Sequence, residues 1–106
     1  MEAEGLMVSR EGYIAVYIMA SGLHRTLYIG VTSDLSRRAY EHREGARPGF
    51  TKRYKCTRLV WYEPHNTMDT ALQREKSLKR WPRDWKTTLI ERTNPLWSDL
   101  YETLSG

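Results

Sequence analysis

The chain has 106 residues, a mass of 12.5 kDa and a formal net charge of +4, and 40% of its residues are hydrophobic. This length suits one compact domain, and the composition excludes a disordered acidic protein and a fibrous repeat. The longest apolar run, residues 14–20, is far shorter than the roughly 20 residues of a membrane-spanning helix, so we expect no membrane partner.

Residues 1–11 show no hydrophobic periodicity and are predicted to be a flexible leader before a single domain at 12–102 and a C-terminal tail at 103–106. The leader lacks the basic and apolar regions of a secretory signal. The single cysteine, Cys56, cannot form an internal disulfide, which fits a reducing compartment. We therefore predict a cytoplasmic protein.

Three short segments have the composition of β-strands. Residues 13–20 and 27–31 are rich in Ile, Val and Tyr and are separated by a turn-like Ser21-Gly22, which predicts an antiparallel hairpin. Residues 59–62 predict a third strand, which Pro64 ends.

Capping residues and prolines mark the helices. The expected helices run from a cap within 32–34 through Arg43, from a cap at 66 or 67 to about Arg80, from Pro82 to about Arg92, and briefly after Asn94-Pro95. Gly45 should end the first of them. The element order, strand, strand, helix, strand, helix, helix, predicts an α+β fold with a small antiparallel or mixed three-stranded sheet flanked by helices.

Positive charge is concentrated in two segments. Residues 36–58 hold eight basic and two acidic residues, an excess of +6, and residues 74–86 hold six basic and two acidic residues, an excess of +4. With a sequence pI near 9.4, this distribution favours a nucleic-acid partner. Two solvated helix faces would give the same pattern, because ordinary surface helices also carry many lysines.

Glu75 interrupts an apolar stripe on the second predicted helix. A carboxylate that faces a core costs about 1–3 kcal/mol unless it is paired or binds a metal ion, so Glu75 needs a partner. The alternative is a glutamate at the stripe edge that pairs with Arg74 or Lys79 on the surface. The other members of the stripe, at spacings of three and four, are Met68, Ala71, Leu72 and Leu78.

Two further places combine packing positions with reactive side chains. Arg38 and His42 share the apolar face of the first predicted helix, where Arg suits a grip on phosphate and His can transfer a proton; a long Arg on an ordinary amphipathic helix is the alternative. The hairpin carries Tyr17, Tyr28 and Gly30, and a glycine within a strand signals close approach. Tyrosines are also good strand formers that pack against helices, and taken alone this ordinary explanation is the favoured one.

Tyr17 ends the triplet Ala15-Val16-Tyr17 and Tyr28 begins the triplet Tyr28-Ile29-Gly30, eleven residues from one tyrosine to the other. This pattern resembles the GIY-YIG endonuclease family, specifically its small standalone bacterial members. The first triplet departs from Gly-Ile-Tyr at two positions, and the second is intact. The resemblance covers about residues 12–102, and other positions of the family pattern fall on Arg38, His42, Glu75, Asn94 and the loop 49–54.

The resemblance implies that the chain hydrolyses phosphodiester bonds with one divalent metal ion, Mg²⁺ or Mn²⁺, held by Glu75. Arg38 would clamp a phosphate oxygen. Tyr17 is the first choice for general base, Tyr28 would position the water or share that role, and His42 would relay the proton.

DNA is the partner that the resemblance implies, and no obligate protein partner is evident. Asn94 would hold Glu75 or a loop in place. A basic loop at 47–55 contains aromatic residues, which suits an unpaired strand, so we predict a preference for single-stranded DNA. The alternative function is an inactive nucleic-acid-binding module that keeps the nuclease fold. The residues expected to contact nucleic acid are Gly30, Arg37, Lys52, Arg53 and Tyr54.

Aromatic side chains outside the motif have two interpretations. The four tryptophans, Trp61, Trp81, Trp85 and Trp97, could stack on unpaired bases. We expect at least two of them in the core, and the spacing of Trp85 and Leu89 indicates packing. His24 and His65 lie in predicted turns without a second ligand at metal spacing, and we expect both to be exposed.

Overall fold

The computed structural model describes residues 13–22, 26–45 and 55–104. Strands and helices follow one another in the order predicted from the sequence, and the fold is α+β. The elements are β1 (Ala15–Ala20), β2 (Leu27–Thr32), α2 (Leu35–Glu44), β3 (Arg58–Pro64), α4 (Met68–Arg80), α5 (Arg83–Thr93) and α6 (Tyr101–Leu104). None of the helices in these ranges has the length and apolar character that crossing a bilayer requires.

The sheet has three strands in the order β2-β1-β3, and both pairings are antiparallel. The predicted hairpin is therefore confirmed. β1 is the central strand, and each of its six residues is fully buried. Since side chains alternate between the two faces of a strand, β1 supplies a core on both sides of the sheet.

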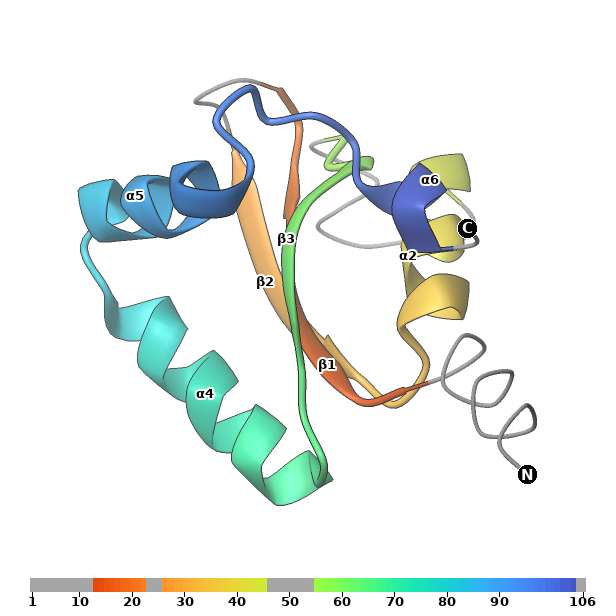
Figure 1. Cartoon of the computed structure of the whole chain (residues 1–106), viewed down its shortest axis with the longest axis vertical. Helices are drawn as coiled ribbons and strands as arrows, with labels where there is room; N and C mark the ends of the chain where they lie inside the picture. Colours follow the sequence, from red (N-terminus) through yellow and green to blue (C-terminus); the bar gives the residue numbers. More distant parts are fainter. Residues whose placement is uncertain (1–12, 23–25, 46–54, 105–106) are drawn as a thin grey trace.

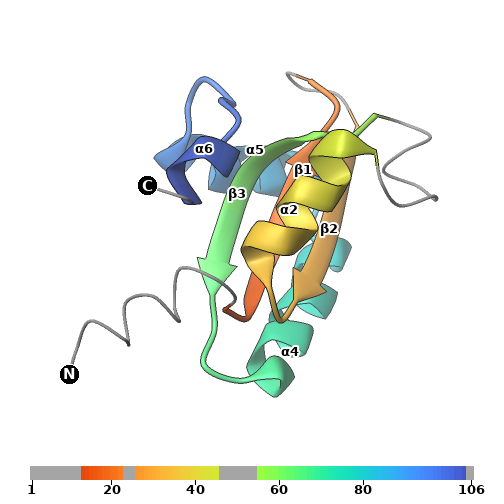
Figure 2. The same ribbon diagram turned by 90° about the vertical axis from the view of Figure 1, so that its right-hand side faces the viewer.

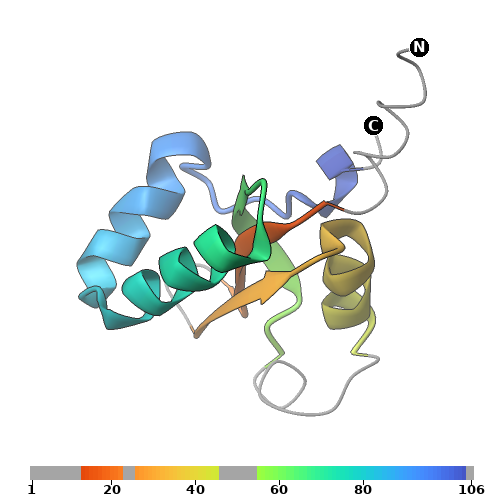
Figure 3. The same ribbon diagram turned by 90° about the horizontal axis from the view of Figure 1, so that it is seen from below.

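Helices cover both faces of the sheet (Figure 1). α2 lies across one face, and α4 lies behind the sheet in the same view (Figure 2). Tyr17 and Met19 face the α2 side with Leu35 and Ala39, whereas the other side is covered by α4 and α5. The core on that second side contains Val16, Ile18, Ala20, Ile29, Ala71, Leu78 and Ile90. As a result, α2 and α4 flank the edge strand β2 from opposite sides (Figure 3).

The helix ends follow the local chemistry that the sequence predicted. Asp34 caps α2 by accepting a hydrogen bond from the backbone N–H of Arg37, and Gly45 ends α2 with a φ of 67°. A positive φ is strained for residues with a side chain, so glycine suits this position. Thr67 caps α4 through the backbone N–H of Thr70, and Pro82 immediately precedes α5.

The prediction of a short helix directly after Asn94-Pro95 is wrong. That segment is a turn, and the last helix, α6, begins only at Tyr101. The Asn94 Oδ1 atom accepts a hydrogen bond from the backbone N–H of Ser98 at 3.0 Å, which closes a loop instead of capping a helix. Trp97 also has a φ of 57°, outside the helical region. Leu104 in α6 is buried, so ordered structure extends past the predicted domain boundary at Glu102.

Candidate active site

Tyr17, Tyr28 and His42 form one cluster on the sheet face that α2 covers. The Tyr17 hydroxyl and His42 Nε2 are 2.9 Å apart and hydrogen-bonded. The His42 ring centroid lies 5.5 Å from that of Tyr17 and 5.4 Å from that of Tyr28, and the two tyrosine rings are 6.2 Å apart. Tyr17 and His42 are buried, whereas Tyr28 is half-buried. Two strands and one helix therefore bring three proton-carrying rings into contact.

Gly30 is required by the ring of Tyr17. The two residues are partners across the β1–β2 pairing. A Cβ atom at position 30 would lie 2.6 Å from both Cζ and the hydroxyl oxygen of Tyr17, and 2.9 Å from Cε2 of Tyr28. Ordinary contacts start near 3.4 Å. The close approach that the sequence predicted at this glycine is confirmed, and its partners are the two tyrosine side chains.

Arg38 lies at a polar hollow of about 160 Å³ between the end of β2 and the first turns of α2. Its Nε atom is 3.3 Å from Glu41 Oε1, and Arg37 Nε is 3.3 Å from the other oxygen of the same carboxylate. The Arg38 side chain is about one-third exposed, so it is accessible to an anion. Sequence reasoning missed Glu41, although its spacing of three and four residues from the two arginines was a readable signal.

Glu75 lies at the edge of the buried stripe of α4. Ala71 and Leu78 are buried as expected, but Leu72 is 38% exposed, so its assignment to the stripe is wrong. The Glu75 side chain is 15% exposed, and its Oε2 atom is 2.9 Å from Lys79 Nζ. The structure therefore contains one of the two pairings that the sequence left open.

A groove of about 280 Å³ links this part of α4 to the edge strand. It runs along residues 27–29 of β2 and is completed by Lys79 and Lys86. Burial, with a smaller contribution from Arg83, lowers the pKa of Lys86. Sequence reasoning missed Lys86, because nothing in the spacing of α5 indicated that this lysine would meet β2.

The catalytic candidates are thus distributed around one strand. Tyr28 belongs to β2, Arg38 and His42 approach from α2, and the Glu75–Lys79 pair approaches from α4. Figure 3 shows these two helices on either side of β2.

Comparison with known proteins identifies the family. The family model described as the GIY-YIG catalytic domain matches residues 13–88. The chain belongs to the GIY-YIG family. A UPF0213 protein of Haloquadratum walsbyi is 35% identical over 79 residues, which are 74% of this chain and 88% of that protein. A UPF0213 protein of Bacillus pumilus is 32% identical over 85 residues, 80% of this chain and 84% of the relative.

The UPF0213 relatives are themselves small proteins, because the matches cover most of their length. A third one, from Staphylococcus aureus, is 33% identical over 66 residues, or 62% of this chain and 80% of that protein. Their shared name states no activity. No solved structure matches the chain. Membership of the GIY-YIG family indicates a nuclease that acts on nucleic acid and generally uses a divalent metal ion.

The donor set around Glu75 fits a metal ion that keeps most of its water ligands. Within the described ranges, no three Asp, Glu, His or Cys side chains come together as a metal cluster. A single carboxylate suits Mg²⁺ or Mn²⁺, which bind oxygen ligands and retain water. The Glu75 carboxylate is already bonded to one cation, the Lys79 ammonium, so a positive charge is accommodated at this position.

Asn94 holds a loop and a strand. Its Nδ2 atom donates to the carbonyl oxygens of Val60 at 3.1 Å and Ser98 at 2.9 Å. The β1–β3 register shifts between Ile18 and Met19, which leaves Val60 as the extra residue of a β-bulge. The sequence left open whether Asn94 holds Glu75 or a loop in place, and these contacts hold a loop. Among the described residues Asn94 does not bond to Glu75, and its catalytic assignment stays a prediction.

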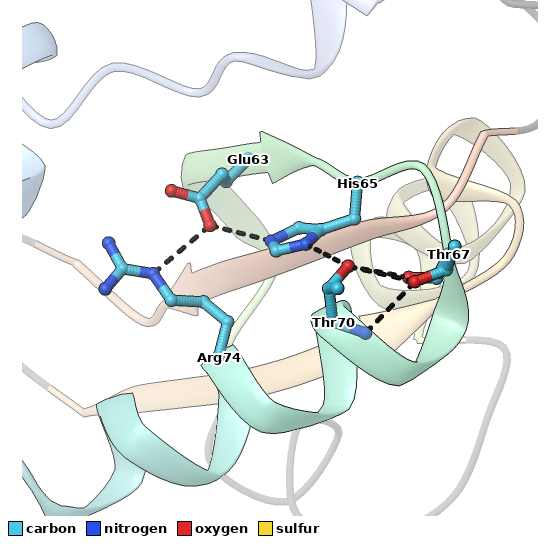
Figure 4. A network of polar contacts seen from close by, with 5 residues as sticks. All are labelled: Glu63, His65, Thr67, Thr70 and Arg74. Atoms are coloured by element: carbon cyan, nitrogen blue, oxygen red, sulfur yellow. Dashed lines mark hydrogen bonds and ion pairs between the residues drawn. The ribbon is translucent and has the colours of Figure 1, made fainter.

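The remaining predicted residues differ in outcome. Lys52, Arg53, Tyr54 and His24 lie outside the described residues. The Arg37 side chain is 75% exposed and is available to a ligand. The expectation that His65 is exposed is wrong, because only 15% of its side chain is accessible. Its Nε2 atom hydrogen-bonds with Glu63 at 2.8 Å and its Nδ1 atom with Thr70 at 2.9 Å (Figure 4).

Proposed function

We propose that this GIY-YIG protein is a metal-dependent endonuclease that hydrolyses phosphodiester bonds of DNA. The observation that carries the proposal is the hydrogen bond of 2.9 Å between the Tyr17 hydroxyl and His42 Nε2, beside Tyr28. A phenol bonded to an imidazole can pass a proton, a capacity that packing alone does not require. Family membership and the two basic segments support a nucleic-acid substrate.

Arg38 binds the scissile phosphate in this proposal. Its planar guanidinium can donate two parallel hydrogen bonds to phosphate oxygens. In the free protein it contacts Glu41, and a partly exposed pair of this kind contributes only about 0–1 kcal/mol. A phosphate can therefore displace the carboxylate at little cost, while Glu41 keeps its contact with Arg37.

Tyr17 activates the attacking water. Its proton passes to His42 Nε2, and the resulting phenolate takes a proton from the water that attacks phosphorus. Because a free phenol titrates near pH 10 and a free imidazole near 6.5, the phenolate needs positive charge close by, which Arg38 supplies from the same helix as His42. Tyr28 orients the water or shares the role of base.

Glu75 is the residue that would hold the metal ion. When bound, such an ion supplies positive charge that polarises the phosphate and stabilises the leaving 3′ oxygen. Lys79 must then give up its contact with the Glu75 carboxylate, and its ammonium becomes free to bind a neighbouring phosphate in the groove along β2.

Cleavage of labelled DNA tests this proposal. The purified protein is incubated with DNA in Mg²⁺, Mn²⁺ or EDTA, and we expect cutting with either metal and none in EDTA. Glu75→Ala should abolish cutting. The matched control is Asp69→Ala, which removes the other carboxylate of α4 from its exposed first turn and should leave cutting intact. Metal-independent cutting, or equal loss in both variants, would contradict the assignment of Glu75.

The preferred substrate in this proposal is single-stranded DNA. Support comes from the basic loop at 47–55, which interleaves aromatic and cationic residues. One sequence is presented as a single strand and as a perfect duplex at matched salt, and the single strand should be cut faster. Equal or faster duplex cutting would rule out this preference. Salt-sensitive binding without any cutting would instead favour the inactive binding module.

A further inference from the structure

A second groove lies on the other side of α4 from the Glu75–Lys79 pair. Its volume is about 360 Å³, and it is formed where the C-terminal part of α4 meets α5. Four residues of α5 at spacings of three and four supply one wall. The lining residues are Arg74, Trp81, Trp85, Thr88, Leu89 and Arg92.

Trp85 is unusually exposed for its size. Trp61 and Trp97 are buried, which confirms that at least two tryptophans are core residues, but Trp85 is 56% exposed. The expectation that Trp85 packs in the core is therefore wrong. Its ring meets that of Trp81 edge to face, with centroids 5.7 Å apart and an interplanar angle of 78°. This contact fixes the orientation of Trp85 while more than half of the residue stays accessible.

The groove is positively charged. Arg74 and Arg92 line it, and no lining residue carries a negative charge. Arg74 lies over the ring of Trp81, 5.3 Å from its centroid, and its Nε atom is 3.1 Å from Glu63 Oε1. Glu63 also bonds with His65, so this network fixes Arg74 on the β3 side of α4 (Figure 4). The position of Arg74 is therefore set before any ligand arrives.

We propose that this groove binds an unpaired nucleotide, whose base stacks on Trp85 and whose phosphate contacts Arg92 and Arg74. The two arginines favour a polyanion over a peptide that has few acidic residues. The exposed indole favours a ligand that carries a base over phosphate alone. The inference rests on the proposed DNA substrate and adds to it a strand-binding surface separate from the catalytic residues around β2. A DNA strand bound there would cross α4 to reach them.

Binding measured without cleavage tests the site. A fluorescently labelled oligothymidylate, which cannot form a duplex with itself, is titrated with the protein in EDTA. Trp85→Ala should weaken binding by about 5- to 140-fold, the range that one base–aromatic stack contributes. Trp85→Phe keeps an aromatic face and should retain most of the affinity. Arg92→Ala should weaken binding and reduce the salt dependence by about one counterion.

The matched control is Tyr40→Ala, which removes another exposed aromatic residue, 52% accessible, from α2 and should leave binding unchanged. Unchanged binding by Trp85→Ala, or equal losses in the Trp85→Ala and Tyr40→Ala variants, overturns the inference, as does a wild-type protein that binds no oligothymidylate. Cleavage is assayed separately. Loss of binding in Trp85→Ala with no cleavage by the wild type would overturn the proposed nuclease and leave the strand-binding site supported.

Discussion

Replacing Gly30 by alanine should displace the ring of Tyr17 while leaving the residue in place, so the variant tests whether the position of Tyr17 matters. The new Cβ atom would lie 2.6 Å from Cζ and the hydroxyl oxygen of Tyr17, and ordinary contacts begin at 3.4 Å, so the ring must move by roughly 0.8 Å. The hydroxyl is 2.9 Å from His42 Nε2, and a displacement of this size takes it out of good hydrogen-bond geometry. We expect a stability loss of about 1–3 kcal/mol, which is typical of overpacking.

The larger effect should be on cleavage. A misplacement near 1 Å in a catalytic group costs about 10²-fold in rate, so Gly30→Ala should lose about that much activity while remaining folded. The assay is single-turnover cleavage of labelled DNA, together with urea unfolding. Ile90→Val serves as the stability control, because it removes about 0.5–1.5 kcal/mol from the core on the other side of the sheet, away from Tyr17.

A double mutant identifies the cause. If Gly30→Ala acts by displacing the Tyr17 hydroxyl, it should reduce activity no further in a Tyr17→Phe background, because that hydroxyl is already absent. Additive losses would show that position 30 acts independently of Tyr17, and full activity of Gly30→Ala would refute the role of the Tyr17–His42 geometry.

Three other predictions concern single side chains. Arg38→Lys should be nearly as inactive in DNA cleavage as Arg38→Ala, because an ammonium lacks the two-pronged grip on phosphate; substantial lysine activity would reduce Arg38 to simple charge attraction. Asn94→Ala should lower the free energy of unfolding in urea by about 1–3 kcal/mol, because it leaves the carbonyl of Val60 unsatisfied. Burial, with a contribution from Tyr62, raises the pKa of Tyr13 from 10.0 to about 12. The stability that this shift gives the folded protein is therefore present below pH 10 and lost as pH rises towards 12. Tyr13→Phe should therefore lose less stability across that interval, and identical alkaline unfolding curves would contradict the shift.

Local chemistry was sufficient to predict most element boundaries. The hairpin follows from two β-rich runs around Ser21-Gly22, and the limits of α2 follow from Asp34 and Gly45, which act through bonds within their own turns. The turn after Asn94 could not be predicted in the same way. Asparagine followed by proline is typical of a helix start, but here the amide is used by a carbonyl of β3, 34 residues earlier in the chain.

Residue spacing also gave wrong predictions for two exposed residues, one in α4 and one in α5. The spacing of apolar residues in α4 places Leu72 in the buried stripe. In the structure, however, α4 buries Ala71 and Leu78 and leaves Leu72 accessible. Trp85 also has helical spacing to an apolar residue, Leu89, but only Leu89 packs against the core, and Trp85 stays 56% exposed. Which flank of a helix is covered depends on the width of the sheet beneath it, and a three-stranded sheet is narrow.

The narrow sheet also bears on the proposal that candidates from two helices act on one substrate. Tyr28 and Gly30 alternate along β2 with Leu27 and Ile29, so one strand presents a phenol to the α2 side and an apolar contact to the α4 side. Because β2 is an edge strand, no further strand separates the two helices that flank it. In the proposed mechanism, a phosphate at this edge would meet Arg38 from one side and Glu75 from the other. The Tyr-Ile-Gly triplet thus serves both faces of the sheet at once, and a one-residue slip of β2 would turn Tyr28 towards α4 and place a side chain against Tyr17.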